Sequence, residues 1–431
     1  MGSDPYPVSV SSLHFPSREL QSVSQTLSSL RRSALSLTNR LRSIESDATF
    51  AQEVSDHYDL PLVANERCGS WYIPPEAKCG SAYFKSTDGH TGQWDFSFRR
   101  LNLQILPIAQ KFGGCIIVDS TRRGKLMPDA LSKTVPIWSA VINRALFPSD
   151  TAYHPVQFPP NFLGESEESQ IEKRIDGFIK SLKDLKLDLD HLRQQLGKPI
   201  RIAWANRSYF HPTDLYKGDE YNLLVLCSAS KRVHGAEISE GGYIQGAGDD
   251  SESWAYGLTP PVFWANKSTI FQTAEEDLPQ LFEELAKEQS QQESVHQATL
   301  VTPTQNLYIG PSDGRTNESG LYDLVIDCNA PADASEDKVQ AFISSQLTPD
   351  PSRSLLVTCE SGKDLSAGVL LTILCSFYDD TGAFASSGQP RISKQFIRQR
   401  LAWIVSSKHD VNPSRTTLQS VNAFLMQRPD Y

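Results

Sequence analysis

The chain has 431 residues, of which 39% are hydrophobic and 21% charged, and its formal net charge at pH 7 is −10. This length exceeds what one hydrophobic core usually serves, so we expect two or three domains of ordinary soluble composition. No apolar run reaches the roughly 20 residues that cross a bilayer, and the N-terminus lacks the basic start and apolar core of a signal peptide. We therefore expect a soluble, cytoplasmic protein with no membrane partner.

Seven cysteines are scattered through the chain without a C-x-x-C pair or a zinc-like spacing, which favours reduced thiols in the cytosol. The acidic net charge argues against a nucleic-acid partner, although a local basic patch can still bind phosphate groups. The basic clusters are Arg31, Arg32, Arg40 and Arg42; Arg99 and Arg100; Arg122, Arg123 and Lys125; and Lys394, Arg398 and Arg400.

Residues 1–58 form an N-terminal region in which we expect one long helix over 20–48. Apolar residues recur there at steps of three and four from Leu20 to Ala48, which is typical of a helix with one buried stripe. The arginines of this helix would face either solvent or the phosphates of an RNA. The candidate RNA contacts are Arg31, Arg32, Arg40 and Arg42.

Residues 59–275 alternate between apolar runs and helical patterns, which is typical of an α/β domain. We expect buried strands at 113–120, 199–205 and 221–227, a helix at 134–146, and one amphipathic helix over 171–192. The acidic, glutamine-rich residues 276–298 favour a connecting helix that fades into a linker, and a second compact α/β domain follows over 299–431.

The C-terminal domain contains an apolar strand, a cysteine, a glycine-bearing loop and an apolar helix in VTCESGKDLSAGVLLTI at 357–373. Such a turn directs backbone N–H groups and a helix N-terminus at one spot, which suits a phosphate. The pattern resembles the C-x-x-G-x-x-R loop of dual-specificity phosphatases, and the likeness extends over the second domain. The expected phosphate loop comprises Cys359, Glu360, Ser361, Gly362, Lys363, Asp364 and Ser366.

Two departures from that phosphatase pattern bear on catalysis by the loop. Thr358 stands where the family has a histidine, and Leu365 stands where it has the arginine that grips the phosphate. Cys359 therefore has less help in staying a thiolate, and we predict a phosphate-binding loop without a nucleophile. A purely structural loop is the alternative.

The first N-terminal motif is FKSTDGHTGQWDF at 84–96, which combines glycines and hydroxyls with an acid and a histidine. Glycines and hydroxyls suit a phosphate cradle, and either Asp88 or His90 could act as a base. The candidate phosphate ligands are Lys85, Thr87, Gly89 and Thr91. An ordinary surface turn is the alternative.

The second motif, IIVDSTRRGKLMPDALSKT at 116–134, is a strand that ends in Asp119 and runs into a cationic turn. It superficially resembles the phosphoribosyl pyrophosphate loop of phosphoribosyltransferases, in which acids meet the ribose and small residues hold the 5′-phosphate. The candidate phosphate ligands are Ser120, Thr121, Arg122, Arg123, Gly124, Lys125 and Lys133.

The third motif, YIQGAGDDSESWAYGLTP at 243–260, places Asp249 and Asp250 directly after two glycines. Carboxylates at this density could hold a hard cation such as Mg²⁺, so these two aspartates are the candidate metal ligands. A solvated acidic turn is the alternative.

Five blocks taken together resemble one family, the initiator tRNA phosphoribosyl transferases of fungi and plants, from about residue 60 to the end of the chain. The blocks are NERCGSWYI, AYFKSTDGHTGQWDFSFRRLNL, GGCIIVDSTRRGKLMPDALSKTVPIW, GAGDDSESWAYGLTP and CESGKDLSAGVLL. The resemblance implies that a T-stem adenosine 2′-hydroxyl of initiator tRNA attacks C1 of phosphoribosyl pyrophosphate, which excludes that tRNA from elongation.

This chemistry asks for cations and Mg²⁺ to hold pyrophosphate and for a base near the 2′-hydroxyl. The resemblance assigns positive charge to Arg122, Arg123, Lys125 and Lys133, and it leaves Asp88, His90 and Asp119 as the base or ribose contact. Two rivals remain open. One is a phosphatase acting on RNA or nucleotide phosphates, and the other is a non-catalytic RNA-binding protein.

Overall fold

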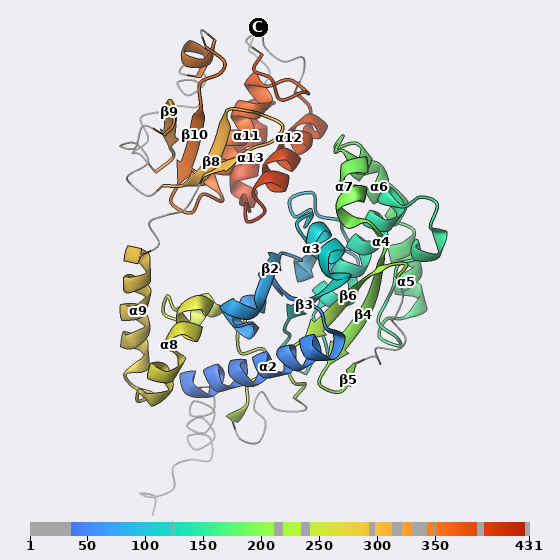
Figure 1. The fold of residues 1–431 in the computed structure, drawn as a ribbon, viewed down its shortest axis with the longest axis vertical. Helices are drawn as coiled ribbons and strands as arrows, with labels where there is room; N and C mark the ends of the chain where they lie inside the picture. The colour runs from blue at the N-terminus through green and yellow to red at the C-terminus, as the bar shows by residue number, and fades with distance from the viewer. Residues whose placement is uncertain are drawn as a thin grey trace, which may run out of the picture.

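The computed structural model describes residues 36–426 apart from 123, 211–218, 234–241, 293–297, 313–320, 330–342, 349 and 386–391. Two parts are visible, each built around its own mainly parallel sheet with helices packed against it (Figure 1). This confirms the expected α/β class. Within the described ranges, no helix has both the length and the apolar character that a membrane span requires.

The N-terminal sheet has six strands, of which five run parallel. Its spatial order is β2 (Lys78–Ala82), β1 (Leu62–Asn65), β3 (Gly114–Asp119), β6 (Asn222–Ser228), β4 (Ile200–Asn206) and β5 (Tyr209–Phe210), the last antiparallel to β4. β1 lies between β2 and β3 in the sheet. The chain therefore passes from β1 to its neighbour β2 on one side and then crosses to β3 on the other side of β1. The carboxyl ends of β1 and β3 therefore form a topological switch point, which is where open α/β sheets usually bind ligands.

Helices cover both faces of this sheet (Figure 1). One face is covered by α3 (Ile105–Phe112), α4 (Val135–Leu146), α5 (Glu165–Glu172), α6 (Ile175–Lys183) and α7 (Leu189–Leu196). The other face is covered by α2 (Leu37–Tyr58), α8 (Pro260–Gln272) and α9 (Leu278–Gln292). Leu278 and Phe282 of α9 are fully buried in this second layer, so the connecting helix packs on the N-terminal core.

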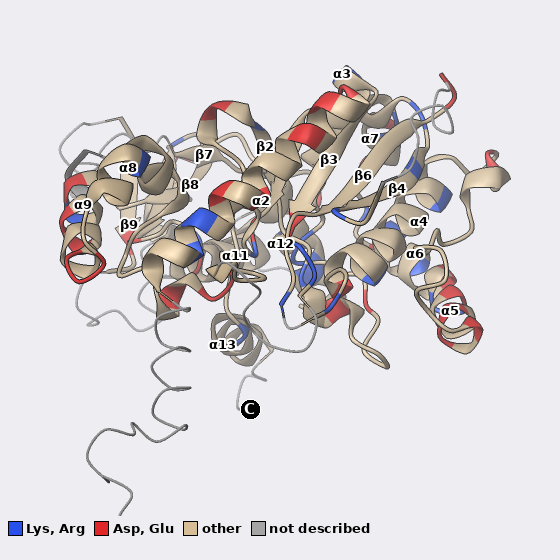
Figure 2. Cartoon of the chain, turned by 90° about the horizontal axis from the view of Figure 1, so that it is seen from below, with Lys and Arg blue, Asp and Glu red and all other residues tan. Residues whose placement is uncertain are grey.

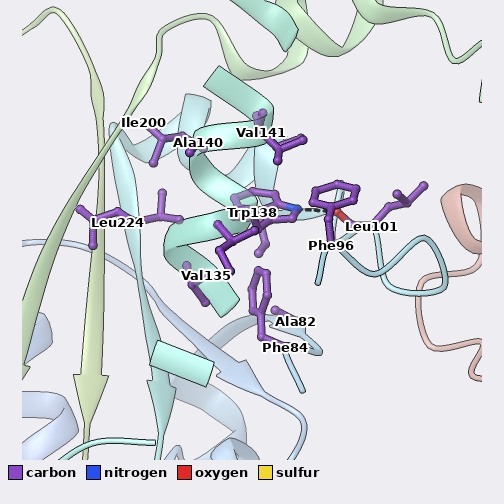
Figure 3. Packing of buried hydrophobic residues seen from close by; sticks show 14 of the residues in the cluster. Ala82, Phe84, Phe96, Leu101, Val135, Trp138, Ala140, Val141, Ile200 and Leu224 are labelled. Carbon is purple, nitrogen blue, oxygen red and sulfur yellow. Dashed lines mark hydrogen bonds between the residues drawn. The ribbon is translucent and has the colours of Figure 1, made fainter. Parts of the chain in front are cut away.

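Trp138 of α4 lies at the centre of the first layer (Figure 3). Its ring meets Phe84 edge-on at a centroid distance of 5.5 Å, and its indole Nε1 donates to the Leu101 carbonyl at 2.7 Å. Phe84 is the first residue of the glycine-rich motif at 84–96, and Leu101 lies shortly after its end. The packing of α4 therefore fixes both ends of that motif.

The strands expected at 113–120, 199–205 and 221–227 are confirmed as β3, β4 and β6, and the helix at 134–146 is confirmed as α4. The single helix expected over 171–192 is wrong, since the segment forms α5, α6 and α7. The chain turns before α7 because Lys186 adopts a left-handed backbone with φ of 53°, and the Asp188 carboxylate caps the new helix at the His191 amide.

The long N-terminal helix also differs from its expected bounds. Its described part, α2, begins at Leu37 and continues past Ala48 to Tyr58, where Asp59 turns left-handed and ends it. The apolar stripe continues through Ala51 and Val54, which are fully buried. The expected stretch before residue 36 lies outside the described residues, as do Arg31 and Arg32.

The C-terminal sheet has the order β7 (Thr299–Leu300), β8 (Leu307–Pro311), β10 (Leu355–Cys359) and β9 (Leu324–Asp327). Its helices are α11 (Leu365–Phe377), α12 (Lys394–Ser407) and α13 (Arg415–Leu425). The two parts touch through α12, where Gln399 donates to the Asp184 carbonyl at 2.7 Å and Ala402 joins the N-terminal core. Lys186 and Asp380 add an exposed ion pair across the same interface.

Asp47 on α2 is a carboxyl group with no solvent-exposed surface. Its Oδ1 receives hydrogen bonds from Arg207 at 3.3 Å and from the Tyr243 hydroxyl at 2.9 Å. Burial nevertheless outweighs these partners and raises the pKa of Asp47 to about 8.

This raised pKa predicts how stability depends on pH. Between about pH 4 and 8 the unfolded chain loses the Asp47 proton while the folded chain keeps it, so the free energy of unfolding falls as pH rises, by up to about 1.4 kcal/mol per pH unit. Asp47→Asn cannot titrate and is expected to weaken this dependence. Urea unfolding at pH 5 and pH 8 measures it, and equal pH dependence in both proteins would contradict the assignment.

Candidate functional site

Arg67 occupies the switch point at the carboxyl end of the sheet. It follows β1, and its Nη2 and Nε donate to Oδ1 of Asp119, the last residue of β3, at 2.8 and 3.2 Å. Asn65 donates to the other carboxylate oxygen of Asp119 at 2.8 Å and also receives the Phe84 amide at 2.7 Å. One polar network therefore links the ends of β1 and β3 with the start of the motif at 84–96.

The carboxylate of Asp119 is completely buried and fully engaged. Besides Asn65 and Arg67, it accepts from its neighbouring Ser120 amide at 2.7 Å and from the Cys68 thiol at 3.2 Å. A base needs a free lone pair within reach of its substrate. Both oxygens of Asp119 are thus engaged within the protein, and the carboxylate holds the guanidinium of Arg67 in place.

The third motif closes over this network. Asp249 Oδ2 lies 3.2 Å from Arg67 Nη1 and 3.2 Å from Arg122 Nε, and Asp250 pairs with Arg122 Nη1. The two candidate metal ligands are thus held by arginines. The second oxygen of Asp249, Oδ1, is buried and has no hydrogen-bond partner in the described part of the chain, with the weakly donating Cys68 thiol beside it.

Two glycines allow that close approach. Gly246 has a left-handed φ of 70°, and a Cβ there would clash with the Arg122 side chain. A Cβ on Gly248 would lie 2.9 Å from Trp71 Cβ. The Gly248 amide donates to the Tyr72 hydroxyl at 2.7 Å, and this hydroxyl bonds Ser120 Oγ at 3.0 Å.

Arg40 also holds the third motif from inside the protein. Its Nη1 donates to the Ala247 carbonyl at 2.8 Å, and its guanidinium lies 5.0 Å from the centre of the Trp254 ring. Arg40 is therefore partly buried and bonded within the protein, and its role as an RNA contact stays a prediction. Arg42, two residues further along α2, is exposed.

The electrostatics of the network keep Arg67 charged. Burial alone would lower the pKa of Arg67, but the carboxylates of Asp119 and Asp249 beside it outweigh burial and raise that pKa. Burial together with both carboxylates also raises the pKa of the Cys68 thiol, so this cysteine stays neutral.

Two exposed cations stand at the mouth of the network. The side chains of Arg122 and Lys125 are 46% and 63% exposed. Gly124 between them has a left-handed φ of 72°, and its amide donates to Gln245 at 3.0 Å, which shapes the turn. Ser120 and Thr121 are buried below it, and Arg123 lies outside the described residues.

Lys133 and the residues of the first motif form a second cluster. Lys133 is only 6% exposed and pairs with Asp129 at 3.3 Å and Glu167 at 3.2 Å. His90 reaches Asp129 at 3.5 Å, and the Thr91 hydroxyl and the Trp94 indole donate to Glu167, each at 3.1 Å. The Lys133 charge is thus compensated inside the protein, while His90 is about half exposed.

Asp88 lies on the inner side of the first motif. Its Oδ2 is buried without a hydrogen-bond partner among the described residues, and burial raises its pKa. It lines a small cavity together with Arg100. Gly89 is packed so tightly that a Cβ would lie 2.8 Å from the Asp129 carbonyl, while Lys85 and Thr87 keep side-chain surface in solvent.

Within the described ranges, no group of three or more His, Cys, Asp or Glu side chains could hold a metal ion. Mg²⁺ often keeps several waters and binds through one or two carboxylates plus substrate phosphates. The unpartnered Asp249 Oδ1 fits one such ligand position.

In the C-terminal loop, Cys359 Sγ lies 3.1 Å from Ser366 Oγ. Burial alone would raise the pKa of Cys359, but the Ser366 hydroxyl and the amides of Ser366 and Asp364 lower it to about 7. The cationic help that the sequence lacks at Thr358 and Leu365 is thus partly replaced by hydrogen bonds from the loop itself. Leu365 is 51% exposed and offers no donor where the phosphatases have arginine.

Several amides of this loop already have acceptors. Glu360 N donates to Asn329, Gly362 N to the Cys359 carbonyl, and Lys363 N to Ser361 Oγ. Gly362 has a left-handed φ of 65°, and a Cβ there would lie 2.5 Å from Pro311 N. The glycine is therefore required by the turn itself.

The fold and the two loops define a class of protein: an α/β enzyme-like domain with a cationic switch-point site, joined to a phosphatase-like domain. Two family models match the chain, one described as the Rit1 N-terminal domain over residues 30–287 and one as the Rit1 DUSP-like domain over residues 334–425. The chain belongs to the Rit1 family. This confirms both the family resemblance and the dual-specificity-phosphatase-like C-terminal domain.

Two relatives match nearly the whole chain. A protein of Saccharomyces cerevisiae named tRNA A64-2′-O-ribosylphosphate transferase is 32% identical over 94% of this chain and 95% of its own length. An uncharacterised protein of Schizosaccharomyces pombe is 36% identical over 90% of this chain and 94% of its own length. No solved structure shows a significant match.

The network predicts unequal structural roles for its two arginines. Arg67→Ala would leave the buried Asp119 carboxylate unpaired and should lower the free energy of unfolding by about 3–5 kcal/mol. Arg122→Ala removes a half-exposed side chain and should cost about 1 kcal/mol or less. Chemical unfolding of both variants measures this, and equal losses would contradict the buried role of Arg67.

Proposed function

We propose that the chain is a tRNA 2′-O-ribosylphosphate transferase, a pentosyltransferase that uses phosphoribosyl pyrophosphate. Its acceptor would be the 2′-hydroxyl of a T-stem adenosine in initiator tRNA. Membership of the Rit1 family and the name of the yeast relative support the reaction class. The observation that carries the proposal is the network of Arg67, Asp119, Asp249 and Arg122 at the sheet switch point.

The network suits a pyrophosphate donor because its inner arginine is fixed and its two outer cations, although ion-paired with aspartates, keep about half or more of their side-chain surface in solvent. Arg67 supplies a preorganised positive charge, while Arg122 and Lys125 present exposed donors a short distance along the same loop. Fixed charges aimed at a leaving group stabilise the transition state without reorganising as the reaction proceeds. We assign the donor pyrophosphate to this edge of the sheet.

In the reaction, the acceptor 2′-oxygen forms a bond to C1 of the donor, and the bond from C1 to pyrophosphate breaks with its electron pair leaving on pyrophosphate. The 2′-hydroxyl proton passes to a base. Of the three candidates, Asp119 is fully engaged and Asp88 Oδ2 is enclosed, which leaves His90 as the exposed group. We assign the base role to His90.

A magnesium ion would neutralise charge on the leaving pyrophosphate when bound. Asp249 Oδ1 would give it one protein ligand, with phosphate oxygens and water completing the coordination. Asp250 would stay with Arg122 and keep that side chain over the site.

Exposed arginine and lysine would also contact the tRNA. Arg42 on α2 is a candidate phosphate contact, as are Arg31 and Arg32 in the preceding segment.

All seven cysteines are free, which supports our assignment of the enzyme to the reducing cytoplasm.

A phosphatase activity is the second candidate, favoured by the lowered pKa of Cys359. The exposed Leu365 argues against it, because no guanidinium binds the substrate phosphate from that position.

One assay separates the transferase from the phosphatase. Purified protein is incubated with initiator tRNA, Mg²⁺ and donor labelled in its ribose, and label in the tRNA supports transfer. Phosphate release without labelled tRNA supports the phosphatase, and binding alone supports a non-catalytic RNA-binding protein.

Arg122→Ala is expected to raise the KM for the donor about tenfold or more, because a hydrogen bond to a charged group contributes roughly 1.5 kcal/mol or more. Affinity for tRNA should change little. Lys267→Ala is the matched control, since it removes a partly exposed cation that pairs with Glu45 on another part of the domain. An equal loss of tRNA affinity with an unchanged donor KM would reassign Arg122 to the RNA.

A further inference from the structure

The two domains enclose a cleft of about 650 Å³ at the same edge of the sheet as the candidate site. Its N-terminal wall includes Glu66 and Tyr83, which follow the ends of β1 and β2, together with Arg100. Its C-terminal wall includes Lys363 of the phosphatase-like loop and Asn412. Because Glu66 directly precedes Arg67, the cleft begins beside the residues assigned to the donor.

Arg100 is the cation of this wall, and it also lines the small cavity next to Asp88. Its guanidinium stacks on the Tyr83 ring at 4.7 Å, and Nη2 donates to Asn412 Oδ1 across the interface at 2.9 Å. Nε and Nη1 are buried and have no hydrogen-bond partner among the described residues. Buried charged donors without partners are rare in folded proteins and commonly mark a place where a ligand or water binds.

Lys363 brings a second cation to the opposite wall. Its side chain is 50% exposed and lies 3.4 Å from Asp410, an aspartate that Lys408 also contacts at 2.6 Å. Its backbone is fixed, since the Lys363 carbonyl accepts the Asn412 amide at 3.1 Å. The same asparagine that anchors the loop therefore also bonds Arg100, so that the spacing between the two cations is set by one short segment.

We infer that the cleft binds a backbone phosphate of the tRNA acceptor, with Arg100 and Lys363 contributing one cation from each domain. This inference rests on the proposed transferase function and gives the phosphatase-like domain a role in positioning substrate. A phosphate held here lies beside the donor site. The backbone phosphates next to the acceptor nucleotide must lie there too, because the 2′-hydroxyl of that nucleotide has to reach the donor. Double-stranded RNA is recognised mostly through its backbone and 2′-hydroxyls, so cations spaced across a cleft suit this substrate.

The chemistry alone would also admit a phosphate of the donor. The donor is already assigned to Arg67, Arg122 and Lys125, none of which lines this cleft. The cleft also spans both domains and has room for more than a single phosphate group. These two observations favour RNA.

Lys363→Gln in the full-length protein tests the inference with little risk to folding, because this side chain is half exposed. Binding of initiator tRNA without donor is measured across a salt series, and KM values for tRNA and donor are measured separately. The dependence of log affinity on log salt should become shallower by about one unit for each phosphate that the variant no longer neutralises. The tRNA KM should rise while the donor KM stays unchanged, and Arg100→Gln should act in the same direction.

Lys186→Gln is the control, because it also removes an exposed lysine that forms an ion pair at the domain interface, but outside this cleft. It should leave the salt dependence unchanged. An unaltered salt slope in Lys363→Gln, or a raised donor KM with normal tRNA binding, would overturn the inference. If the native protein transfers no label, the proposed function fails, yet the salt series still decides whether the cleft binds RNA.

Discussion

Arg67 and Asp119 join the ends of two neighbouring parallel strands through an ion pair whose acid has no contact with solvent. A buried carboxylate is costly unless hydrogen bonds satisfy it, and Asn65, Cys68 and the Ser120 amide complete that requirement. The arrangement leaves Arg67 with a fixed position and a permanent charge. Asp249, which lies far along the chain, can then be buried beside Arg67, because the guanidinium forms an ion pair with its carboxylate.

The rest of the site follows from this constraint. Once Asp249 is seated, it orients Arg122, and the glycines at 246 and 248 let the loop come close enough to do so. Arg40 on α2 secures the same loop from the other side. The N-terminal helix thus contributes to the site through packing and through hydrogen bonds of Arg40, Ser43 and Asp47 with the segment 243–247. Acidic segments lie along α2, α5 and α9, whereas basic ones gather near the middle of the view around α12 (Figure 2). A net charge of −10 is therefore compatible with a local anion site.

Much of this could be predicted from the sequence where the signal is local. Buried strands show as apolar runs, and Asp119 was identified because it ends such a run before a cationic turn. Arg67 was missed as a site residue, although it stands in a block that carries the family resemblance, because a single arginine after a strand has no periodic pattern. Its partner Asp249 is 182 residues away, and no spacing rule links the two.

Other features of the structure could not be predicted for related reasons. The density of carboxylates at Asp249 and Asp250 predicts metal ligands, but the sequence cannot reveal that arginines also lie opposite these two carboxylates. The sequence predicts one helix over 171–192, whereas the structure has three helices joined by turns. The apolar residues keep a helical spacing across these turns, so the pattern does not reveal them. The missing arginine at Leu365 suggested a poorly stabilised thiolate at Cys359, whereas backbone amides, which any sequence carries, lower its pKa.

Asp119 is proposed to fix Arg67 as the anchor for the donor. Asp119→Asn keeps the size of the side chain and removes its charge, so its donor affinity, measured by titration calorimetry on protein shown to be folded by circular dichroism, tests that claim directly. The account predicts a donor affinity at least about tenfold weaker than that of the native protein, equivalent to roughly 1.4 kcal/mol, with tRNA affinity preserved. A folded Asp119→Asn protein that binds the donor as tightly as the native protein would contradict it.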